Sequence, residues 1–388
     1  MKVAIVGAAG GMASGVIRDL IKETEGVEKV TLIDINENGM QLLKDELNDD
    51  RLDAKVIDVR DRKILTKALE EVDVCANEVN IWIHPDLARD VMYSCLDAKC
   101  HYTDLGEGYG PETIKIKEEF DGKFSNNEIA AILGMGTGPG TTNILSKYCV
   151  DGLDSVEKIE ACVALQNIGK ESPIFVPYYD VESICAEYGD PSYQYLNGEL
   201  KEMPPYGGEK VIVFPDPINK VKCYYTIHPE PAMLSHSFKN KGVKEVTWRQ
   251  KRSDEIEKII RSLMACGFGD LEPLNMDGVE IVPRQFLKKM ISRNIKKNQK
   301  RVIKPEEEHV ILRVVVEGKK GGKKYRYTID RIGSHGTSVT QSYSVQLLAQ
   351  GKIKEGVWFP EDCVDPLDYI EKMKKKGFQF NLKIEEEL

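Results

Sequence analysis

Apolar and polar positions alternate in regular blocks over the first 150 residues. Short apolar runs rich in β-branched residues are separated by longer segments whose apolar residues recur at helical spacing. The predicted strands are residues 2–6, 30–34, 54–57, 73–76, 101–103 and 129–133. This order of elements predicts an α/β fold with a doubly wound parallel sheet, whose ligands bind beyond the carboxyl ends of the strands.

The alternation ends near residue 150, and the pattern then predicts a second, mixed α+β domain with mostly antiparallel strands. The expected strands are 156–165, 211–214, 222–226, 243–250, 310–317 and 323–331, and the expected helices are 179–188, 253–266, 281–291, 337–350 and 365–375. We expect the last two helices to return to the first domain. The expected boundaries are 1–145 for the first domain, 146–335 for a substrate-binding and dimerisation domain, and 336–388 for a returning helical segment.

A glycine-rich turn links the first predicted strand to the first helix. Gly7 permits a tight turn, and Gly10 lets backbone N–H groups approach a pyrophosphate at the helix N-terminus. The spacing GxxGxxA, which ends at Ala13, is a relaxed form of the dinucleotide-binding fingerprint. The candidate cofactor-binding residues of this turn are Gly7, Gly10, Gly11 and Met12. An ordinary loop between a strand and a helix is the alternative.

Asp34 ends the second predicted strand. A carboxylate at this place can accept hydrogen bonds from both ribose hydroxyls of an adenosine, and it repels a 2′-phosphate. No arginine follows at Ile35 or Asn36. NAD is therefore the expected cofactor, and NADP is less favoured.

Further polar residues follow the other predicted strands, at the edge where a ligand is expected. The additional candidates for cofactor binding are Asp58, Val59, Asn77 and Leu105. For Asp58, a role as the N-cap of the next helix is an equally good interpretation.

Hydride transfer at an amine also needs a group that moves a proton. The candidates for this catalytic role are Asp104, Glu78 and Glu107 at the sheet edge and His228 from the second domain. Two carboxyl groups that lie close together raise the pKa of one of them toward neutrality, which suits an acid–base role.

A second glycine-rich segment, residues 134–143, follows the sixth predicted strand. Its four glycines exceed what one turn requires, and its backbone donors could bind a substrate carboxylate at the start of the next helix. The candidate substrate-binding residues are Gly138, Thr141 and Asn143. A flexible crossover into the second domain is the alternative.

Arginine and histidine side chains supply further candidates. Guanidinium groups bind carboxylates through two parallel hydrogen bonds, so Arg249 and Arg284 are expected to bind substrate. Arg313 and Arg331 are further candidates for the same role, with a surface arginine as the usual alternative. Of the six histidines, His228 with Glu230, and also His335, are the best candidates to reach a cleft, with structural roles as the alternative.

Composition narrows the class of protein. The 388-residue chain has 54 Lys and Arg against 63 Asp and Glu, a net charge of −9, which argues against a nucleic-acid or anionic-membrane partner. No apolar run reaches the ~18 residues that a membrane span needs, and the start of the chain lacks a signal-peptide pattern. Nine cysteines without a CxxC pair argue against disulfides and a zinc site. No metal and a cytoplasmic location are therefore expected.

Several motifs together resemble the saccharopine dehydrogenase and lysine 6-dehydrogenase family, nearly from end to end. In the first domain they are GAAGGMA at 7–13, DVxD at 58–61, HYTDLG at 101–106 and GxGPGxxN at 136–143. Later in the chain they are PPYGG at 204–208, FPDP at 214–217, HPEP at 228–231, LLAQG at 347–351, FPE at 359–361 and DP at 365–366. The loop at 77–82 departs from the family, in which small apolar residues and proline are usual.

The resemblance implies an NAD(P)-dependent enzyme that acts on a carbon–nitrogen bond of an amino acid. It implies a Rossmann domain, a mixed α+β domain used for dimerisation, and a C-terminal segment that returns to the first domain. The favoured activity is oxidative deamination of the lysine 6-dehydrogenase type, or saccharopine dehydrogenase activity, in a homodimer. Two alternatives stay open: an imine reductase that forms a secondary amine such as saccharopine or carboxynorspermidine, and a non-catalytic NAD(H)-binding sensor.

Overall fold

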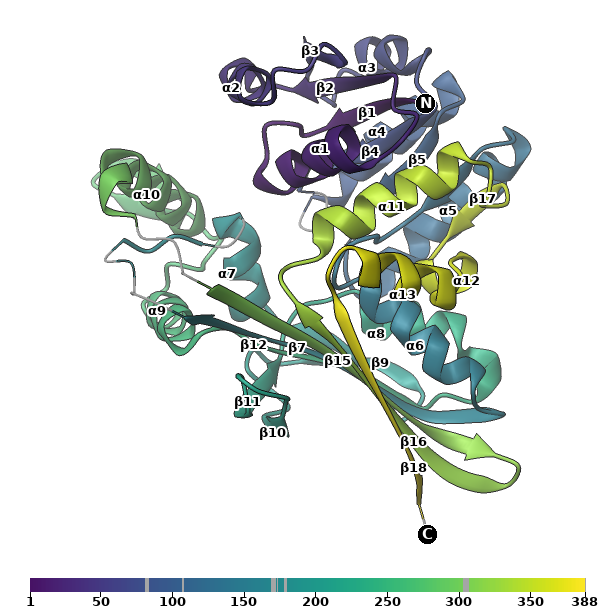
Figure 1. Cartoon of the computed structure of the whole chain (residues 1–388). Coiled ribbons are helices and arrows are strands. Elements are labelled where there is room, and N and C mark those ends of the chain that lie inside the picture. Colours follow the sequence, from purple (N-terminus) through teal and green to yellow (C-terminus); the bar gives the residue numbers. More distant parts are fainter. Residues whose placement is uncertain are drawn as a thin grey trace. The chain divides into compact units, whose positions relative to one another are not determined.

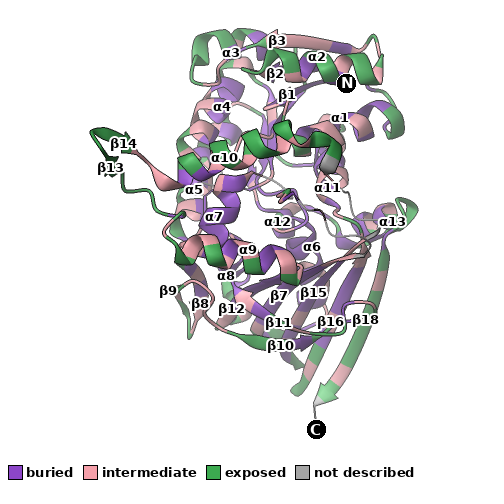
Figure 2. Ribbon diagram, turned by 90° about the vertical axis from the view of Figure 1, so that its left-hand side faces the viewer, coloured by how far each residue is buried: buried purple, intermediate pink, exposed green. Residues whose placement is uncertain are grey.

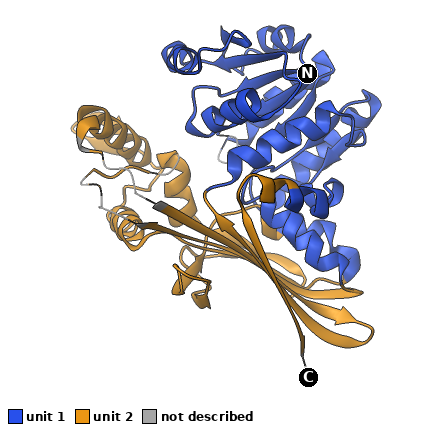
Figure 3. Cartoon of the chain, in the orientation of Figure 1, with its two compact units in different colours: residues 1–152, 232–241, 335–371 blue, residues 153–231, 242–334, 372–388 orange. Residues whose placement is uncertain are grey.

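The structure is a computed structural model that describes residues 1–80, 84–106, 108–168, 172, 174–177, 180–302 and 307–387. The chain divides into two compact units, each assembled from three segments (Figure 3). The first unit consists of residues 1–152, 232–241 and 335–371, and the second of residues 153–231, 242–334 and 372–388.

The first unit contains a seven-stranded sheet in the order β17–β6–β5–β4–β1–β2–β3 (Figure 1). All neighbouring strands are parallel. The strands are β1 (Lys2–Val6), β2 (Lys29–Asp34), β3 (Leu52–Val56), β4 (Val74–Asn77), β5 (His101–Asp104), β6 (Ala130–Ile132) and β17 (Gly356–Trp358). The strand order reverses beside β1, which is the switch point where ligands bind such sheets. The predicted doubly wound parallel sheet is confirmed.

Helices cover both faces of this sheet. The helices of this unit are α1 (Gly11–Glu23), α2 (Glu37–Leu47), α3 (Arg62–Leu69), α4 (Pro85–Ala98), α5 (Pro111–Asn126) and α11 (Thr337–Ala349), together with α6 (Thr141–Asp151) and the short α12 (Pro360–Cys363), which pack against each other. Buried apolar residues of α3, α4 and α5, such as Val91 and Phe120, pack with Tyr102 of β5 in one core. On the other face α1 packs against α11 (Figure 1). The chain therefore returns to the first unit through α11, as the sequence pattern predicts.

The second unit is built on a nine-stranded sheet whose main order is β10–β11–β12–β7–β15–β16–β18. Its strands are β7 (Ser155–Ile168), β8 (Ser192–Leu196), β9 (Glu199–Met203), β10 (Lys210–Val213), β11 (Lys220–Tyr225), β12 (Glu245–Lys251), β15 (Glu307–Lys320), β16 (Lys323–Gly333) and β18 (Gln379–Glu387). β12 and β7 are parallel, and the other pairs are antiparallel. The expected mixed α+β architecture is confirmed.

Three helices of the second unit lie around this sheet: α7 (Val181–Gly189), α9 (Asp254–Ala265) and α10 (Pro283–Lys297). Apolar residues of α7 and α9, among them Ile184 and Ile260, form a small buried cluster. The hairpin of β13 (Leu274–Met276) and β14 (Val279–Ile281) and the adjoining α10 are largely exposed (Figure 2). Two further helices, α8 (Glu230–Ser237) and α13 (Pro366–Lys375), cross the borders of the units.

The unit borders differ from the expected boundaries at the end of the chain. Residues 372–388 belong to the second unit, because β18 pairs with β16 rather than continuing a helical segment. The hairpin β8–β9 and the strand β17 were also not expected. β18 and β9 are edge strands rich in exposed charged residues, so their apolar alternation is too weak to read from the sequence.

Candidate functional site

The turn after β1 has the geometry of a phosphate-binding loop. Gly7 has a positive φ of 78°, and a Cβ there would lie 2.9 Å from the backbone carbon of Glu78. Gly10 precedes α1, and no side chain caps this helix start. Gly10 and Gly11 are exposed, and a Cβ on Gly11 would meet nothing within 4 Å. An open helix N-terminus of this kind fits the pyrophosphate of a dinucleotide.

The Asp34 carboxylate is held beside this loop. Its Oδ2 accepts a hydrogen bond from the Ala9 N–H at 3.0 Å, and its Oδ1 accepts one from the Asn36 N–H at 2.8 Å. Asp34 is half-buried at the end of β2. Its position therefore suits contact with the adenosine ribose of a bound dinucleotide.

Four further candidates for cofactor binding lie near the same edge. Asp58 follows β3 and forms a 2.8 Å ion pair with the exposed Arg60, while Val59 packs against the apolar core. Met12 is half-buried in the first turn of α1, and Leu105 is half-buried directly after β5. The N-cap of α3 is Asp61 rather than Asp58. The structure therefore gives Asp58 no capping role at this helix.

Asn77 ends β4 and is fully buried. Its Nδ2 donates to the hydroxyl oxygen of Tyr102 at 3.0 Å, and its Oδ1 accepts from the Val79 N–H at 3.2 Å. These contacts orient the start of the loop after β4. Glu107, the remaining acidic candidate, lies outside the described residues.

Two buried carboxyl groups lie at the carboxyl ends of β4 and β5. The Glu78 N–H donates to the Val6 carbonyl at 2.8 Å, while Asp104 Oδ1 accepts from the N–H groups of Gly106 and Gly134 at 2.9 and 2.7 Å. Burial first, and the Asp104 charge second, raise the pKa of Glu78 well above its usual range. Glu78 Oε2 is buried without a hydrogen-bond partner among the described residues. A carboxyl with a raised pKa keeps its proton to a higher pH than a free carboxyl does, which suits proton delivery to a ligand.

The glycine-rich loop after β6 differs from the expected substrate site. Thr141 and Asn143 are fully buried at the start of α6. The Thr141 hydroxyl is hydrogen-bonded to Tyr369, and Asn143 Nδ2 donates to Glu361 Oε2 at 2.8 Å. Both side chains therefore anchor neighbouring elements of the first unit, and their expected contacts with substrate stay a prediction. Gly138 is half-buried in the same loop.

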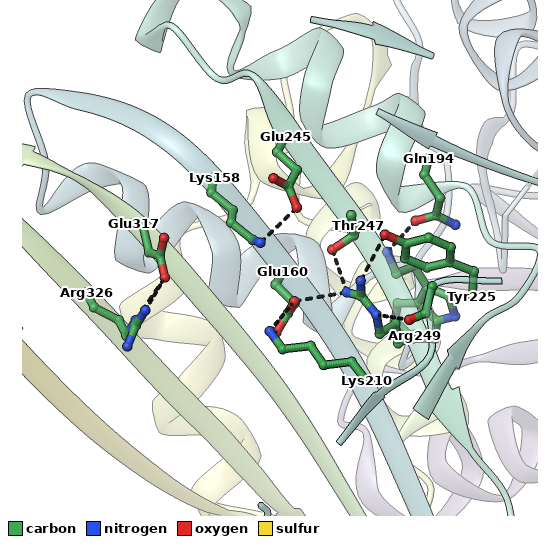
Figure 4. Close-up of polar contacts among 12 residues, drawn as sticks. Lys158, Glu160, Gln194, Lys210, Tyr225, Glu245, Thr247, Arg249, Glu317 and Arg326 are labelled. Carbon is green, nitrogen blue, oxygen red and sulfur yellow. Dashed lines mark hydrogen bonds and ion pairs between the residues drawn. The ribbon is translucent and has the colours of Figure 1, made fainter. Parts of the chain in front are cut away.

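The two arginines expected to bind substrate are also engaged within the fold. Arg249 contacts Glu160 at 2.9 Å and the Tyr225 hydroxyl at 2.9 Å, as Figure 4 shows, and its Nε donates to a backbone carbonyl. Arg284 forms a bidentate pair with Asp190 at 2.6 and 2.9 Å. Both guanidinium groups are buried, and their donors are used locally. Substrate binding by these two residues stays a prediction, and the structure shows each guanidinium paired with an acid of its own unit.

His228 and Glu230 meet in the second unit. His228 Nδ1 lies 2.7 Å from Glu230 Oε2, and the imidazole stacks on Trp248 with ring centroids 3.8 Å apart. His228 Nε2 lies 4.0 Å from Glu187. Glu187 and Trp248 were not singled out from the sequence, although an acid within the apolar segment of α7 was a usable signal.

Glu361 of α12 is a second buried acid that sequence reasoning missed. Its carboxylate accepts hydrogen bonds from Asn143 at 2.8 Å and from the Ser237 hydroxyl at 3.1 Å. Burial, and then the charge of Asp362, raise the pKa of Glu361 to about 8. Its place in the FPE motif at 359–361 could have drawn attention to Glu361 in the sequence. Its burial is visible only in the folded structure.

Membrane-spanning helices and metal-binding clusters are both absent from the described residues. None of their helices is both long and apolar enough to cross a bilayer. They also contain no cluster of three or more side chains suited to hold a metal ion.

Two protein-family models and several known proteins are similar to this chain. The family model "Saccharopine dehydrogenase NADP binding domain" matches residues 3–128, and "Saccharopine dehydrogenase C-terminal domain" matches residues 136–378. Carboxynorspermidine synthase of Vibrio cholerae is 25% identical over 291 residues, which cover 71% of this chain and 67% of the relative. Carboxyaminopropylagmatine dehydrogenase of Synechocystis is 22% identical over 310 residues, which cover 75% of each chain.

A solved structure shares the fold over the whole length. The apo form of histidine-tagged saccharopine dehydrogenase (L-Glu forming) from Saccharomyces cerevisiae aligns with a TM-score of 0.72. The alignment covers 99% of both chains at 14% identity. The two units of this chain therefore have the architecture of that protein.

Proposed function

Because this chain belongs to the saccharopine dehydrogenase family, we propose that it is an NAD(P)-dependent oxidoreductase of a carbon–nitrogen bond that forms or cleaves a carboxylated secondary amine. The buried Glu78 carboxyl beside Asp104, at the same sheet edge as the Gly7 turn, is the observation that carries the proposal. It combines a proton donor with a dinucleotide-binding loop in one unit.

One of the two relatives is named a synthase, which favours the reductive direction, and the other is named a dehydrogenase. Both are named for carboxylated amines, carboxynorspermidine and carboxyaminopropylagmatine. A reductase of this type adds a hydride to the carbon of an imine and a proton to its nitrogen, which yields the secondary amine. Oxidative deamination of the lysine type, the favoured sequence interpretation, stays a prediction and is the second candidate.

The chain's own residues would bind the coenzyme and move the proton. Gly7, Gly10 and Gly11 would bind the pyrophosphate through backbone N–H groups, and Asp34 would accept the ribose hydroxyls. A bound nicotinamide supplies or accepts the hydride. Glu78, whose pKa is raised by burial, would protonate the imine nitrogen in reduction and take the proton back in oxidation. Because Asp34 repels a 2′-phosphate, NAD is the preferred coenzyme.

The test is a coenzyme assay at 340 nm with the purified full-length chain. Agmatine, 1,3-diaminopropane and lysine would each be combined with an amino-aldehyde or a 2-oxo acid in the presence of NADH or NADPH, and secondary amines would be tested with the oxidised coenzymes. Consumption of reduced coenzyme that requires both the amine and the carbonyl compound supports the proposal. Turnover of lysine alone with NAD would instead establish the lysine-type dehydrogenase.

Glu78→Gln tests the proton-transfer role in the same assay. We expect turnover to fall about 10²–10⁴-fold, the usual contribution of a general acid, while NADH binding changes little. Asp53→Asn, at a partly exposed position on the neighbouring strand β3, is the matched control. Full activity of Glu78→Gln would remove Glu78 from the mechanism.

A further inference from the structure

The short hairpin of β13 and β14 has an apolar face that is open to solvent. Its two strands form a sheet of their own, separate from the nine-stranded sheet. Leu274 pairs with Ile281 and Met276 with Val279, so these four side chains share one face. Leu274, Met276 and Val279 are 56, 53 and 61% exposed (Figure 2). Contiguous exposed apolar side chains of this kind mark a contact surface, and a two-stranded hairpin gains stability when such a face is covered.

The adjoining helix α10 has an inner face that is complete within the second unit. Leu287 and Ile291 pack with apolar residues of α7. The two cations of the inner face, Arg284 and Lys288, form ion pairs with acids at the two ends of α7. The charges on this side of the helix are therefore neutralised locally.

The outer face of α10 combines exposed apolar side chains with exposed cations. Phe286 and Met290 lie one helical turn apart and are 43 and 42% exposed. The cations of this face continue toward the end of the helix, and they are Lys289, Arg293, Lys296 and Lys297. None of the four forms an ion pair with another described residue. The outer face thus lacks the charge compensation of the inner face.

The hairpin and the loop before it carry the opposite charge. The acids of this segment are Asp270, Glu272, Asp277 and Glu280. All four are exposed, and none forms an ion pair with another described residue. The hairpin ends directly before α10 begins, whereas three of the four outer cations lie in the last five residues of this helix, which is about 22 Å long. Negative charge therefore gathers at one end of α10 and positive charge at the other.

A twofold axis across the middle of α10 would match these charges. It places two copies of the helix antiparallel, so that the hairpin beside the start of one helix lies beside the end of the other. We propose that the hairpin β13–β14 and the outer face of α10 form a symmetric interface between two copies of this chain. Phe286 and Met290 pack there with their counterparts near the axis, and the acids of each hairpin meet the cations of the opposite helix.

The mixture of charges favours a second copy over an anionic lipid surface. Polybasic surfaces bind lipid through their cations, but here the acids of the hairpin would approach the same head groups. The net charge of −9 opposes that approach as well. In a symmetric pair both sets of charges are neutralised at once, and the apolar side chains between them leave water.

Sedimentation analysis of the full-length chain tests the interface with two charge-reversed variants. Lys296→Glu/Lys297→Glu reverses the end of α10, and Glu272→Lys/Glu280→Lys reverses the hairpin. In either variant like charges face each other twice, so we expect the dissociation constant of the pair to rise at least about tenfold. Lys319→Glu/Lys320→Glu, at exposed positions where β15 ends, is the matched control and should leave association unchanged.

An equimolar mixture of the two variants is the decisive measurement. In a mixed pair the glutamates of the altered helix meet the lysines of the altered hairpin, and the natural hairpin meets the natural helix. We therefore expect mixing to recover most of the association that each variant loses alone. Absence of recovery, while both variants keep the melting temperature of the natural chain, would overturn the proposal.

Phe286→Asp tests the apolar part of the interface and keeps the cations of α10. We expect it to weaken association of the natural chain, because it places a charge near the axis. A natural chain that sediments as a monomer at every concentration would overturn the proposal. Co-sedimentation of such a monomer with phosphatidylserine vesicles, lost in Lys296→Glu/Lys297→Glu, would assign the cations of α10 to a lipid surface instead.

Discussion

At the scale of single residues, burial decides what each acid of this chain can do. Asp34 and Glu78 both follow strands of the first sheet. Asp34 is half-buried and accepts two backbone hydrogen bonds, which suits a charged carboxylate. Glu78 is also half-buried, but its Oε2 is enclosed near Asp104 without a hydrogen-bond partner among the described residues, and this desolvation raises its pKa. The two residue types are chemically alike, and only their surroundings separate a ribose acceptor from a proton donor.

Asp34→Ser tests the coenzyme preference. Loss of the carboxylate removes the repulsion of a 2′-phosphate, so the ratio of NADPH to NADH affinity should rise about tenfold or more. The absolute affinity for NADH should fall, because a ribose acceptor is lost. Fluorescence titration with both reduced coenzymes measures the two constants, and Asp53→Ser on β3 is the control. An unchanged ratio would show that Asp34 does not face the adenosine ribose.

The pH dependence of stability gives a second test of Glu78. A raised pKa in the folded state means that the folded protein holds this proton more tightly than the unfolded chain does. Stability therefore falls as the pH rises from the unfolded pKa near 4.5 toward the folded value. Glu78→Gln stays neutral, so it should be more stable than the natural protein at pH 8, with the gain vanishing at about pH 4. Urea unfolding at both pH values measures this, and equal stability at pH 8 would contradict burial of the charge.

At the scale of elements, the short helix α12 joins two other helices through one side chain. Glu361 accepts hydrogen bonds from Asn143 at the start of α6 and from Ser237 at the end of α8. Asp362 lies beside it and also contacts Ser237 at 3.1 Å, while Lys117 and His236 act electrostatically on Asp362. The glycine-rich loop before α6 is therefore tied to the returning part of the chain.

Glu361→Gln should remove the part of the pH dependence of stability that comes from ionisation of Glu361. Since the pKa of Glu361 is raised to about 8, this one proton lowers the free energy of unfolding by about 1.4 kcal/mol for each pH unit between about 4.5 and 8. The Gln variant keeps a side chain of the same shape beside Asn143 and Ser237, but its free energy of unfolding should not fall with pH in this way. Thermal unfolding of both proteins from pH 5 to 8.5, with the exposed Glu355→Gln as control, measures the difference. Parallel curves would show that Glu361 ionises normally.

At the scale of the whole molecule, each unit is completed by a late segment of the chain. α11 and β17 complete the first unit, and β18 forms an edge of the nine-stranded sheet by pairing with β16. β18 carries exposed charges, including Lys383 and Glu386, which protect such an edge from pairing with other chains. The expected homodimer and cytoplasmic location stay predictions.

Deletion of residues 376–388 should expose the unpaired edge of β16. We expect a lower melting temperature and concentration-dependent aggregation, because backbone donors and acceptors of β16 would lose their partners. Lys383→Ala, which removes only an exposed charge and keeps the strand, should behave like the natural protein. Light scattering during thermal unfolding detects both effects. A truncated chain that melts normally and stays monodisperse would contradict this role of β18.

Much of the fold could be predicted from the sequence, because its helices and strands have strong local patterns of apolar and polar residues. The strands from β1 to β6 and the helices between them follow apolar periodicity. Gly7 has a positive φ that favours glycine, and Asp34 ends a strand at the edge where ligands bind. The residues of the candidate site could be predicted only in part from the sequence. Arg249, Arg284, Thr141 and Asn143 have suitable chemistry but bind partners within their own unit, and no local pattern reveals such partners.

The parallel sheet, the glycine turn, the acidic strand end and the family resemblance could all be predicted, because they depend on residue type and short-range spacing. Which polar groups are buried, and which neighbours they meet, depends on how the chain packs in three dimensions. The raised pKa values of Glu78 and Glu361 come from burial among segments far apart in the chain. Burial and charge pairing are properties of three-dimensional packing, and they separate a structural acid or amide from a functional one.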